Sequence, residues 1–252
     1  MHLTGVIHMT GTFDLVLIAV SYAISVFGSY TGLVLAGQIT NLRNTMDRTW
    51  LVFAAVALGG GAIWSMHFIG MLAYKPPMPV TYDPILTVVS LVAAVVFVGL
   101  GVYLVIRQAR MKFATLASAG VIMGLGVAAM HYTGMAAMQF AGESHYDQTI
   151  VALSVVIAIV ASIAALWIAF HVRTTWQKLV SAFVMGVAVC GMHYTAMYGF
   201  SMTPNATRMR VEPSTIMASE LAGYIVVATI AVLVVALLSV FGRELRRIDT
   251  SN

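Results

Sequence analysis

Three histidines, each followed four residues later by a methionine, are the residues of this chain most suited to chemistry. They lie in Met66-His67-Phe68-Ile69-Gly70-Met71, Met130-His131-Tyr132-Thr133-Gly134-Met135 and Met192-His193-Tyr194-Thr195-Ala196-Met197. Imidazole suits copper, zinc, iron and nickel, and the soft thioether of methionine favours Cu(I) over hard ions such as Mg²⁺. The pattern predicts a metal site that prefers copper, as Cu(I) or Cu(II), over zinc or haem iron.

Helical spacing ranks the candidate ligands. Residues four apart share one face of a helix, so each histidine lies beside the second methionine of its motif. The predicted ligands are therefore His67, Met71, His131, Met135, His193 and Met197. The first methionines point about 100° away from the histidines, and a cysteine precedes one histidine by three residues. These weaker candidates are Met66, Met130, Met192 and Cys190.

The repetition extends beyond the motif. Seven residues before each histidine stands a glycine suited to close helix packing, at Gly60, Gly124 and Gly186. Each preceding apolar segment opens with an aspartate and has a serine seven residues later: Asp14, Asp83, Asp147, Ser21, Ser90 and Ser154. These side chains are possible hydrogen-bond partners of the metal ligands. Helix capping is the favoured explanation of the aspartates, and hydrogen-bonded packing that of the serines.

The elements that carry these residues are membrane-spanning helices. Of 252 residues, 60% are hydrophobic and 9% charged, and the mean hydropathy is +0.93. Helices of about 20 residues cross a bilayer, and seven such spans are predicted at about 14–37, 50–73, 85–106, 114–139, 149–170, 179–201 and 218–242. We expect an all-α membrane protein in one domain over 1–252, with three helical hairpins (about 12–75, 82–140 and 146–202) and a final helix.

Charge predicts the orientation in the membrane. Of the 13 Lys and Arg residues, ten flank one end of the predicted spans: Arg43, Arg48, Arg107, Arg110, Lys112, Arg173, Lys178, Arg243, Arg246 and Arg247. The other end has Lys75, Arg208 and Arg210. The positive-inside rule then places the N-terminus and the three motifs on the outer side of the membrane and the C-terminus in the cytoplasm. The net charge of +4 follows from this asymmetry, so no nucleic-acid partner is expected.

The second and third motifs, Met130-His131-Tyr132-Thr133 and Met192-His193-Tyr194-Thr195, resemble the MHYT domain of bacterial membrane sensors. The first copy departs from that motif at Phe68 and Ile69 but keeps His67 and Met71, so the tyrosine and threonine are the least constrained positions. The resemblance covers about residues 10–242. It implies a sensory module that binds copper through motif Met and His residues and perceives a diatomic gas (O₂, CO or NO) or redox state.

The same resemblance implies cytoplasmic partners of the diguanylate cyclase, phosphodiesterase or histidine kinase type. The chain ends at Asn252, about ten residues beyond the last predicted span, so we expect a sensor module without enzyme activity of its own. Two alternatives stay open: a copper-binding or copper-transporting membrane protein, and a haem or metal enzyme of the membrane. The polar residues gather in the outer half, which disfavours a path across both leaflets.

Overall fold

The computed structural model describes residues 11–39, 47–76, 78–108, 112–205 and 216–249. Its helices are α1 (Leu15–Ala36), α2 (Arg48–Ala55), the π-helix η1 (Val56–Trp64), α3 (Ser65–Ala73), α4 (Pro84–Ile106), α5 (Phe113–Ala136), α6 (Gln148–His171), α7 (Thr175–Tyr198) and α8 (Ala218–Asp249). Because α2, η1 and α3 form one continuous span, seven helices are long and apolar enough to cross a membrane. The seven predicted spans are confirmed to within a few residues at most ends.

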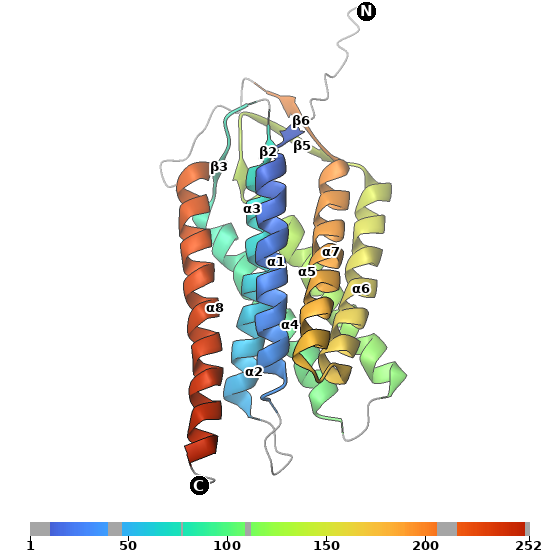
Figure 1. Cartoon of the computed structure of the whole chain (residues 1–252). Helices are drawn as coiled ribbons and strands as arrows, with labels where there is room; N and C mark the ends of the chain where they lie inside the picture. The colour runs from blue at the N-terminus through green and yellow to red at the C-terminus, as the bar shows by residue number, and fades with distance from the viewer. Residues whose placement is uncertain (1–10, 40–46, 77, 109–111, 206–215, 250–252) are drawn as a thin grey trace, which may run out of the picture.

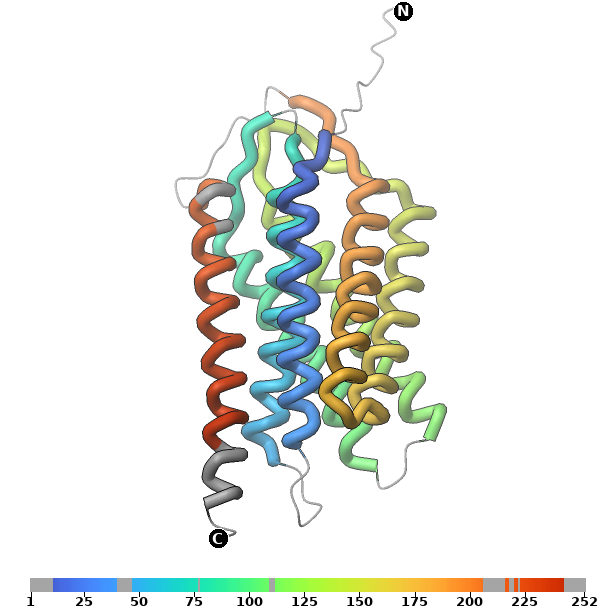
Figure 2. The backbone as a smooth tube through the Cα atoms, viewed as in Figure 1, coloured from blue at the N-terminus to red at the C-terminus, as the bar shows by residue number. Residues whose placement is uncertain are grey.

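Six of the spans form a closed ring. Each of them packs against its neighbours in the chain, and α1 also packs against α7, which closes the ring. In Figures 1 and 2, α1 lies between α7 and α8. The last helix, α8, stands outside the ring against α1, η1 and α3. Across the ring, the motif helix α3 contacts both α5 and α7, and a side chain of α5 reaches one of α7, which brings their histidines toward one axis.

Short strands, which the sequence did not predict, join the helix ends that carry the motifs (Figure 1). Strand β1 (Thr12–Phe13) pairs with β2 (Tyr74–Lys75), β3 (Thr81–Tyr82) with β4 (Met138–Gln139) and β7 (Ile216–Met217), and β5 (Gly142–Tyr146) with β6 (Phe200–Pro204). Each predicted hairpin is thus tied between its first and last residues. The backbone N–H groups of Asp14, Asp83 and Asp147 donate to the carbonyls of Ala73, Ala137 and Gly199, at 2.8, 2.8 and 2.9 Å.

The three aspartates cap helices, as the capping interpretation predicts. The carboxylate of Asp14 accepts hydrogen bonds from the N–H groups of Val16 and Leu17 at the start of α1. Asp83 and Asp147 do the same for α4 and α6. Lys75 lies 2.9 Å from the Asp14 carboxylate, and this hydrogen-bonded ion pair lowers the pKa of Asp14.

Positive charge gathers at the opposite end of the bundle. Arg48 begins α2, Arg107 and Lys112 flank the connection from α4 to α5, and Arg173 precedes α7. Lys178 lies in the first turn of α7 and not in a loop, because a capping box of Thr174 and Gln177 starts this helix at Thr175, ahead of the predicted residue 179. Arg243, Arg246 and Arg247 belong to the last turns of α8, whereas Arg43, Arg110, Arg208 and Arg210 lie outside the described residues.

Candidate metal centre

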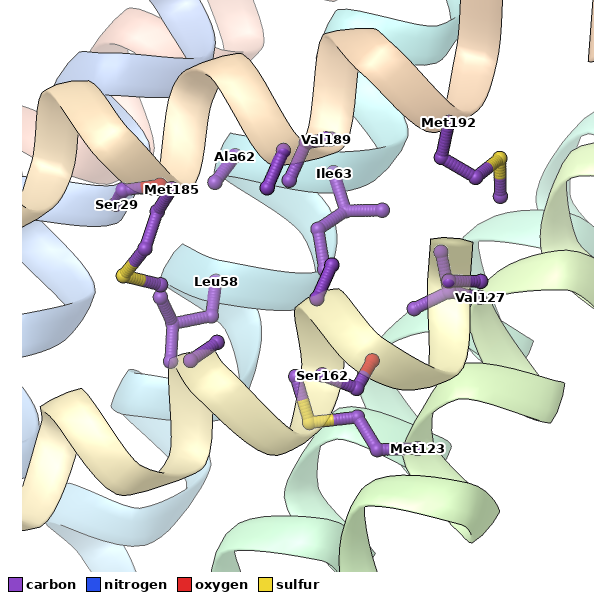
Figure 3. Close-up of a pocket in the computed structure, with 14 residues that line it drawn as sticks. Ser29, Leu58, Ala62, Ile63, Met123, Val127, Ser162, Met185, Val189 and Met192 are labelled. Atoms are coloured by element: carbon purple, nitrogen blue, oxygen red, sulfur yellow. The ribbon is translucent and has the colours of Figure 1, made fainter. Parts of the chain in front are cut away.

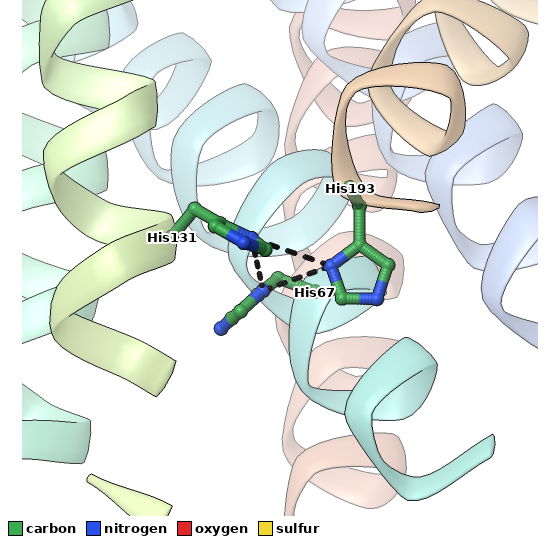
Figure 4. A group of neighbouring side chains, drawn as sticks. All are labelled: His67, His131 and His193. Atoms are coloured by element: carbon green, nitrogen blue, oxygen red, sulfur yellow. Dashed lines mark hydrogen bonds between the residues drawn. The ribbon is translucent and has the colours of Figure 1, made fainter. Parts of the chain in front are cut away.

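The three motif histidines meet at the centre of the ring. His67 comes from α3, His131 from α5 and His193 from α7, and each side chain is only 1% exposed. Their Nδ1 atoms lie 3.0 Å (His131 to His67), 3.1 Å (His67 to His193) and 3.4 Å (His193 to His131) apart. Figure 4 shows the three rings turned toward one another from three helices. The predicted convergence of the histidines is present in the structure.

Hydrogen bonding alone does not satisfy this triangle of nitrogens. A neutral imidazole nitrogen either carries a proton and donates, or is bare and accepts. With three Nδ1 atoms in mutual contact and two possible states, at least two atoms must be in the same state. Two N–H groups or two lone pairs then face each other. A cation at the centre removes the conflict, because it accepts one lone pair from each of the three nitrogens.

The triangle also has the dimensions of a metal site. Three nitrogens bound tetrahedrally at metal-to-nitrogen distances of about 2.0–2.1 Å lie about 3.3 Å from one another, and the observed separations are 3.0–3.4 Å. Three imidazoles in such close contact leave no slot for a porphyrin between them. Their chemistry therefore fits a single transition-metal ion better than a haem.

Glycines of the motifs make room for the outer edges of the rings. A Cβ atom on Gly70 would overlap Nε2 of His193, and one on Gly134 would overlap Nε2 of His67. Neither of these Nε2 atoms has a hydrogen-bond partner among the described residues. The third motif has Ala196 in place of glycine. Two imidazoles are thus positioned by the glycine of a neighbouring motif.

The methionines divide between two buried clusters on either side of the histidines. Met71, Met135 and Met197 belong to a cluster on the strand-bearing side, together with Phe68 and Phe200. Met130 and Met192 belong to the cluster on the other side, and Met66 is also buried. The predicted second methionines of the three motifs therefore share one environment, one helical turn outward from the histidines.

The aspartates, serines and cysteine lie apart from the histidines. Within the described residues, the one group of His, Cys, Asp or Glu side chains whose ligand atoms converge consists of the three histidines. Asp14, Asp83 and Asp147 cap helices instead. Cys190 is a free, half-buried thiol outside this group. The serine hydroxyls Ser21, Ser90 and Ser154 donate to the carbonyls of Ile18, Thr87 and Val151 in their own helices.

Each of these serines also bonds to an aromatic side chain of a motif helix, which sequence analysis missed. Tyr132 and Ser154 hydroxyls lie 2.7 Å apart, and Tyr194 and Ser21 hydroxyls 2.9 Å apart. In the first copy, the indole N–H of Trp64 donates to Ser90 at 3.0 Å. Trp64 is one turn before Phe68 and packs against its ring, with centroids 4.9 Å apart. Trp64 therefore replaces the missing motif tyrosine.

The repeated glycines seven residues before the histidines confirm the predicted close approach of a neighbouring helix. A Cβ on Gly124 would lie 2.5 Å from the Cα of Ile159 in α6, and one on Gly186 would lie 2.8 Å from Val26 in α1. For Gly60 the nearest atom, on Leu91 of α4, would be 3.3 Å away. Glycines and aromatic residues thus join each motif helix to the helix of the next hairpin around the ring.

Several known proteins are similar to this chain in sequence. The family described as "Bacterial signalling protein N terminal repeat", MHYT, matches residues 60–118, 124–182 and 186–249. The chain is 40% identical over 235 residues to the bifunctional diguanylate cyclase/cyclic di-GMP phosphodiesterase MucR of Pseudomonas aeruginosa, a match that covers 91% of this chain and 34% of MucR. No solved structure matches the chain significantly.

Two further relatives are similar over most of this chain. The cyclic di-GMP phosphodiesterase NbdA of Pseudomonas aeruginosa is 33% identical over 83% of the chain, and the signaling protein YkoW of Bacillus subtilis is 32% identical over 80%. The chain spans about a third or less of the length of these relatives, with 27% of NbdA and 26% of YkoW covered. The three matched repeats cover most of the sequence, and the chain belongs to the MHYT family of bacterial signalling proteins.

Proposed function

We propose that this chain is a sensory module that binds one copper ion through His67, His131 and His193. The observation that carries the proposal is the triangle of Nδ1 atoms 3.0–3.4 Å apart, which hydrogen bonds alone leave unsatisfied. Neutral imidazoles hold a cation without placing an anion in the membrane. Copper bound there would supply redox chemistry and affinity for a diatomic gas such as O₂, CO or NO.

The preference for copper over zinc rests on the methionines. Met71, Met135 and Met197 are buried together on the outward side of the triangle, and thioethers are soft ligands that select Cu(I). These residues are the candidates for a fourth ligand. The clustering of basic residues at the other end supports an orientation with the metal centre toward the periplasm of the bacterial inner membrane.

Signal transfer is proposed to run through α8. Ser65, two residues before His67, is within 2.6 Å of the Thr229 hydroxyl of α8, and a Cβ on Gly61 of η1 would lie 2.8 Å from Leu233 of α8. The last helix therefore contacts the span that positions one of the three histidines. The relatives named as cyclic di-GMP enzymes support an output domain or partner of that class on the cytoplasmic side, with no catalysis by the membrane module itself.

Metal analysis of the purified protein tests the proposal. We expect about one copper per chain in the wild type and in His171→Ala, whose histidine lies exposed at the end of α6. The triple variant of His67, His131 and His193 to Ala should lose it. Copper-loaded wild-type protein equilibrated with carbon monoxide should give an infrared band that the triple variant lacks. Equal copper in the triple variant would refute the site, zinc in place of copper would refute the metal assignment, and a Soret band would indicate haem.

A further inference from the structure

An apolar cavity of about 40 Å³ lies inside the ring, on the side of the histidines away from the strands. Its walls come from α1, η1, α5, α6 and α7 (Figure 3). Ile63, Val127 and Val189 line it, and each stands four residues before a motif histidine. Residues four apart share a helix face, so the cavity lies about one turn beneath the three imidazoles. The branched side chains of Ile63, Val127 and Val189 line the part of the cavity nearest to the histidines.

The lining of the cavity favours a neutral, largely apolar occupant. Among the described residues that line it, Ser29 and Ser162 are polar, and the others are alanines, branched residues and methionines. Ser29 is fully buried, and its hydroxyl has no hydrogen-bond partner among the described residues. A buried water requires about two to four polar partners, whereas apolar cavities stay dry and accept xenon or benzene.

The size and surroundings of the cavity restrict the ligand further. A volume of 40 Å³ accommodates about three water-sized probe spheres, which suits a diatomic molecule or a noble-gas atom. Ala161 and Ala165 of α6 and Ala188 of α7 line the cavity and are only half-buried. Because these small side chains are partly exposed, the wall formed by α6 and α7 is the thinnest barrier between the cavity and the lipid, where neutral gases dissolve.

We propose that this cavity binds one small neutral molecule of diatomic size, which comes from the lipid between α6 and α7 and takes at most a hydrogen bond from Ser29. Binding of a small molecule depends only on the cavity itself. A role of the cavity as a gas reservoir beneath the metal centre rests on the proposed function. The site is distinct from the histidine triangle, since no motif histidine lines it.

Xenon tests this proposal in the full chain embedded in lipid nanodiscs. The ¹³C methyl resonances of Val127 should shift with xenon pressure and saturate, whereas those of Ile230, on the exposed face of α8, should respond linearly. Ala161→Leu and Ala188→Leu fill the cavity from two different helices and should reduce the saturable shift at least tenfold. Ala164→Leu adds the same side chain to an exposed position of α6 and should leave the shift unchanged.

The outcomes separate this site from the metal centre. A linear Val127 response in the wild type, or a saturable response that persists in both filled variants, would overturn the proposal. Copper content measured on the same samples should stay the same in Ala161→Leu and Ala188→Leu. Loss of xenon binding with normal copper content supports a separate cavity site, and a saturable xenon response in protein without copper supports the cavity even if the metal assignment fails.

Discussion

The motif tyrosines join neighbouring hairpins through hydroxyl groups. Tyr132 reaches Ser154 and Tyr194 reaches Ser21, while Trp64 provides the same link to Ser90. The absence of a tyrosine in the first copy predicted that this position matters little, but the structure gives it a role in holding the ring together. A tryptophan one turn earlier makes the same hydrogen bond, and alignment of the motifs alone does not reveal such a replacement.

We expect Tyr132→Phe and Tyr194→Phe each to destabilise the protein by about 0.6 kcal/mol and by no more than about 1.7 kcal/mol, the mean and the maximum for hydrogen bonds between membrane helices. Each change removes one hydroxyl and leaves the ring in place. Unfolding of the purified protein by increasing SDS fractions measures the loss. Tyr198→Phe is the matched control, because Tyr198 is 83% exposed. Variants as stable as this control would show that the serine contacts contribute nothing.

Two motif glycines are expected to be essential for metal affinity. Gly70→Ala and Gly134→Ala place a methyl group against Nε2 of His193 and His67, which forces the rings out of the triangle. Copper affinity should fall about tenfold or more, as for other groups that orient metal ligands. Isothermal titration with Cu(I) in a competing chelator measures the change.

Gly191→Ala is the control for these substitutions, because nothing lies within 4 Å of a Cβ at that position of α7. Alanine in an open helical position stabilises a helix by roughly 0.5–1 kcal/mol relative to glycine. All three variants therefore gain helix propensity, and only Gly70→Ala and Gly134→Ala should bind copper more weakly. Equal affinity in all three would contradict the positioning role of Gly70 and Gly134.

At the scale of elements, the apolar runs predicted all seven spans, but not the π-helix inside the second. Val56–Trp64 contains Gly59, Gly60 and Gly61, and the Ser65 hydroxyl donates to the carbonyl of Gly60 at 2.8 Å. This segment packs directly against the backbone of α4: a Cβ on Gly59 would lie 2.7 Å from the carbonyl oxygen of Ala94. Such contacts are invisible in the sequence, as are two-residue strands paired across some sixty residues.

The Asp14–Lys75 pair ties the start of α1 to the end of α3 and makes this link sensitive to acid. Because Lys75 lowers the pKa of Asp14 below its ordinary value of 3.8, the stabilisation is complete above that value and is lost as pH falls through the lowered pKa. Lys75→Met should therefore melt below the wild type at neutral pH, and the difference should shrink as the pH falls below 3.8 and through the lowered pKa of Asp14. Thermal melts between pH 7 and pH 2 measure it.

Salt provides the control for this prediction. Both side chains of the pair are accessible to water, and exposed ion pairs are weakened by salt. One molar sodium chloride should reduce the difference between Lys75→Met and the wild type at neutral pH. A difference that is independent of both pH and salt would mean that the lysine acts through packing and not through its charge.

At the scale of the whole molecule, the sequence left open whether the hairpins form a ring or a row, and the structure is a ring. The sequence does not reveal this arrangement because closure depends on the contact of α1 with α7, two helices that lie far apart in the chain. The predicted convergence of histidines required only that the three motif helices face one axis. The predicted orientation in the membrane rests on charge alone and can be tested directly.

A cysteine-labelling experiment tests the orientation. Cys190 is the chain's one cysteine, so Cys190→Ser gives a background without thiols. In this Cys190→Ser background, Ser144→Cys places a single thiol at the exposed strand-bearing end. In a second variant, Gln108→Cys places a single thiol at the exposed basic end. In intact spheroplasts, a membrane-impermeant maleimide should label position 144 and should label position 108 only after lysis. The reverse pattern would invert the predicted topology.

Closure of the ring also sets the order in which the chain can be completed. Ser21 and Tyr194 are 173 residues apart in the sequence, and ribosomes add about 5–20 residues per second, so α1 waits roughly 9 to 35 s in the bilayer before its partner is made. During that interval the serine and small-residue face of α1 meets lipid, and at most two of the three motif imidazoles have been synthesised. The histidine triangle is therefore completed late in synthesis, and a chain interrupted before α7 inserts carries an open ring with one of its three histidines missing.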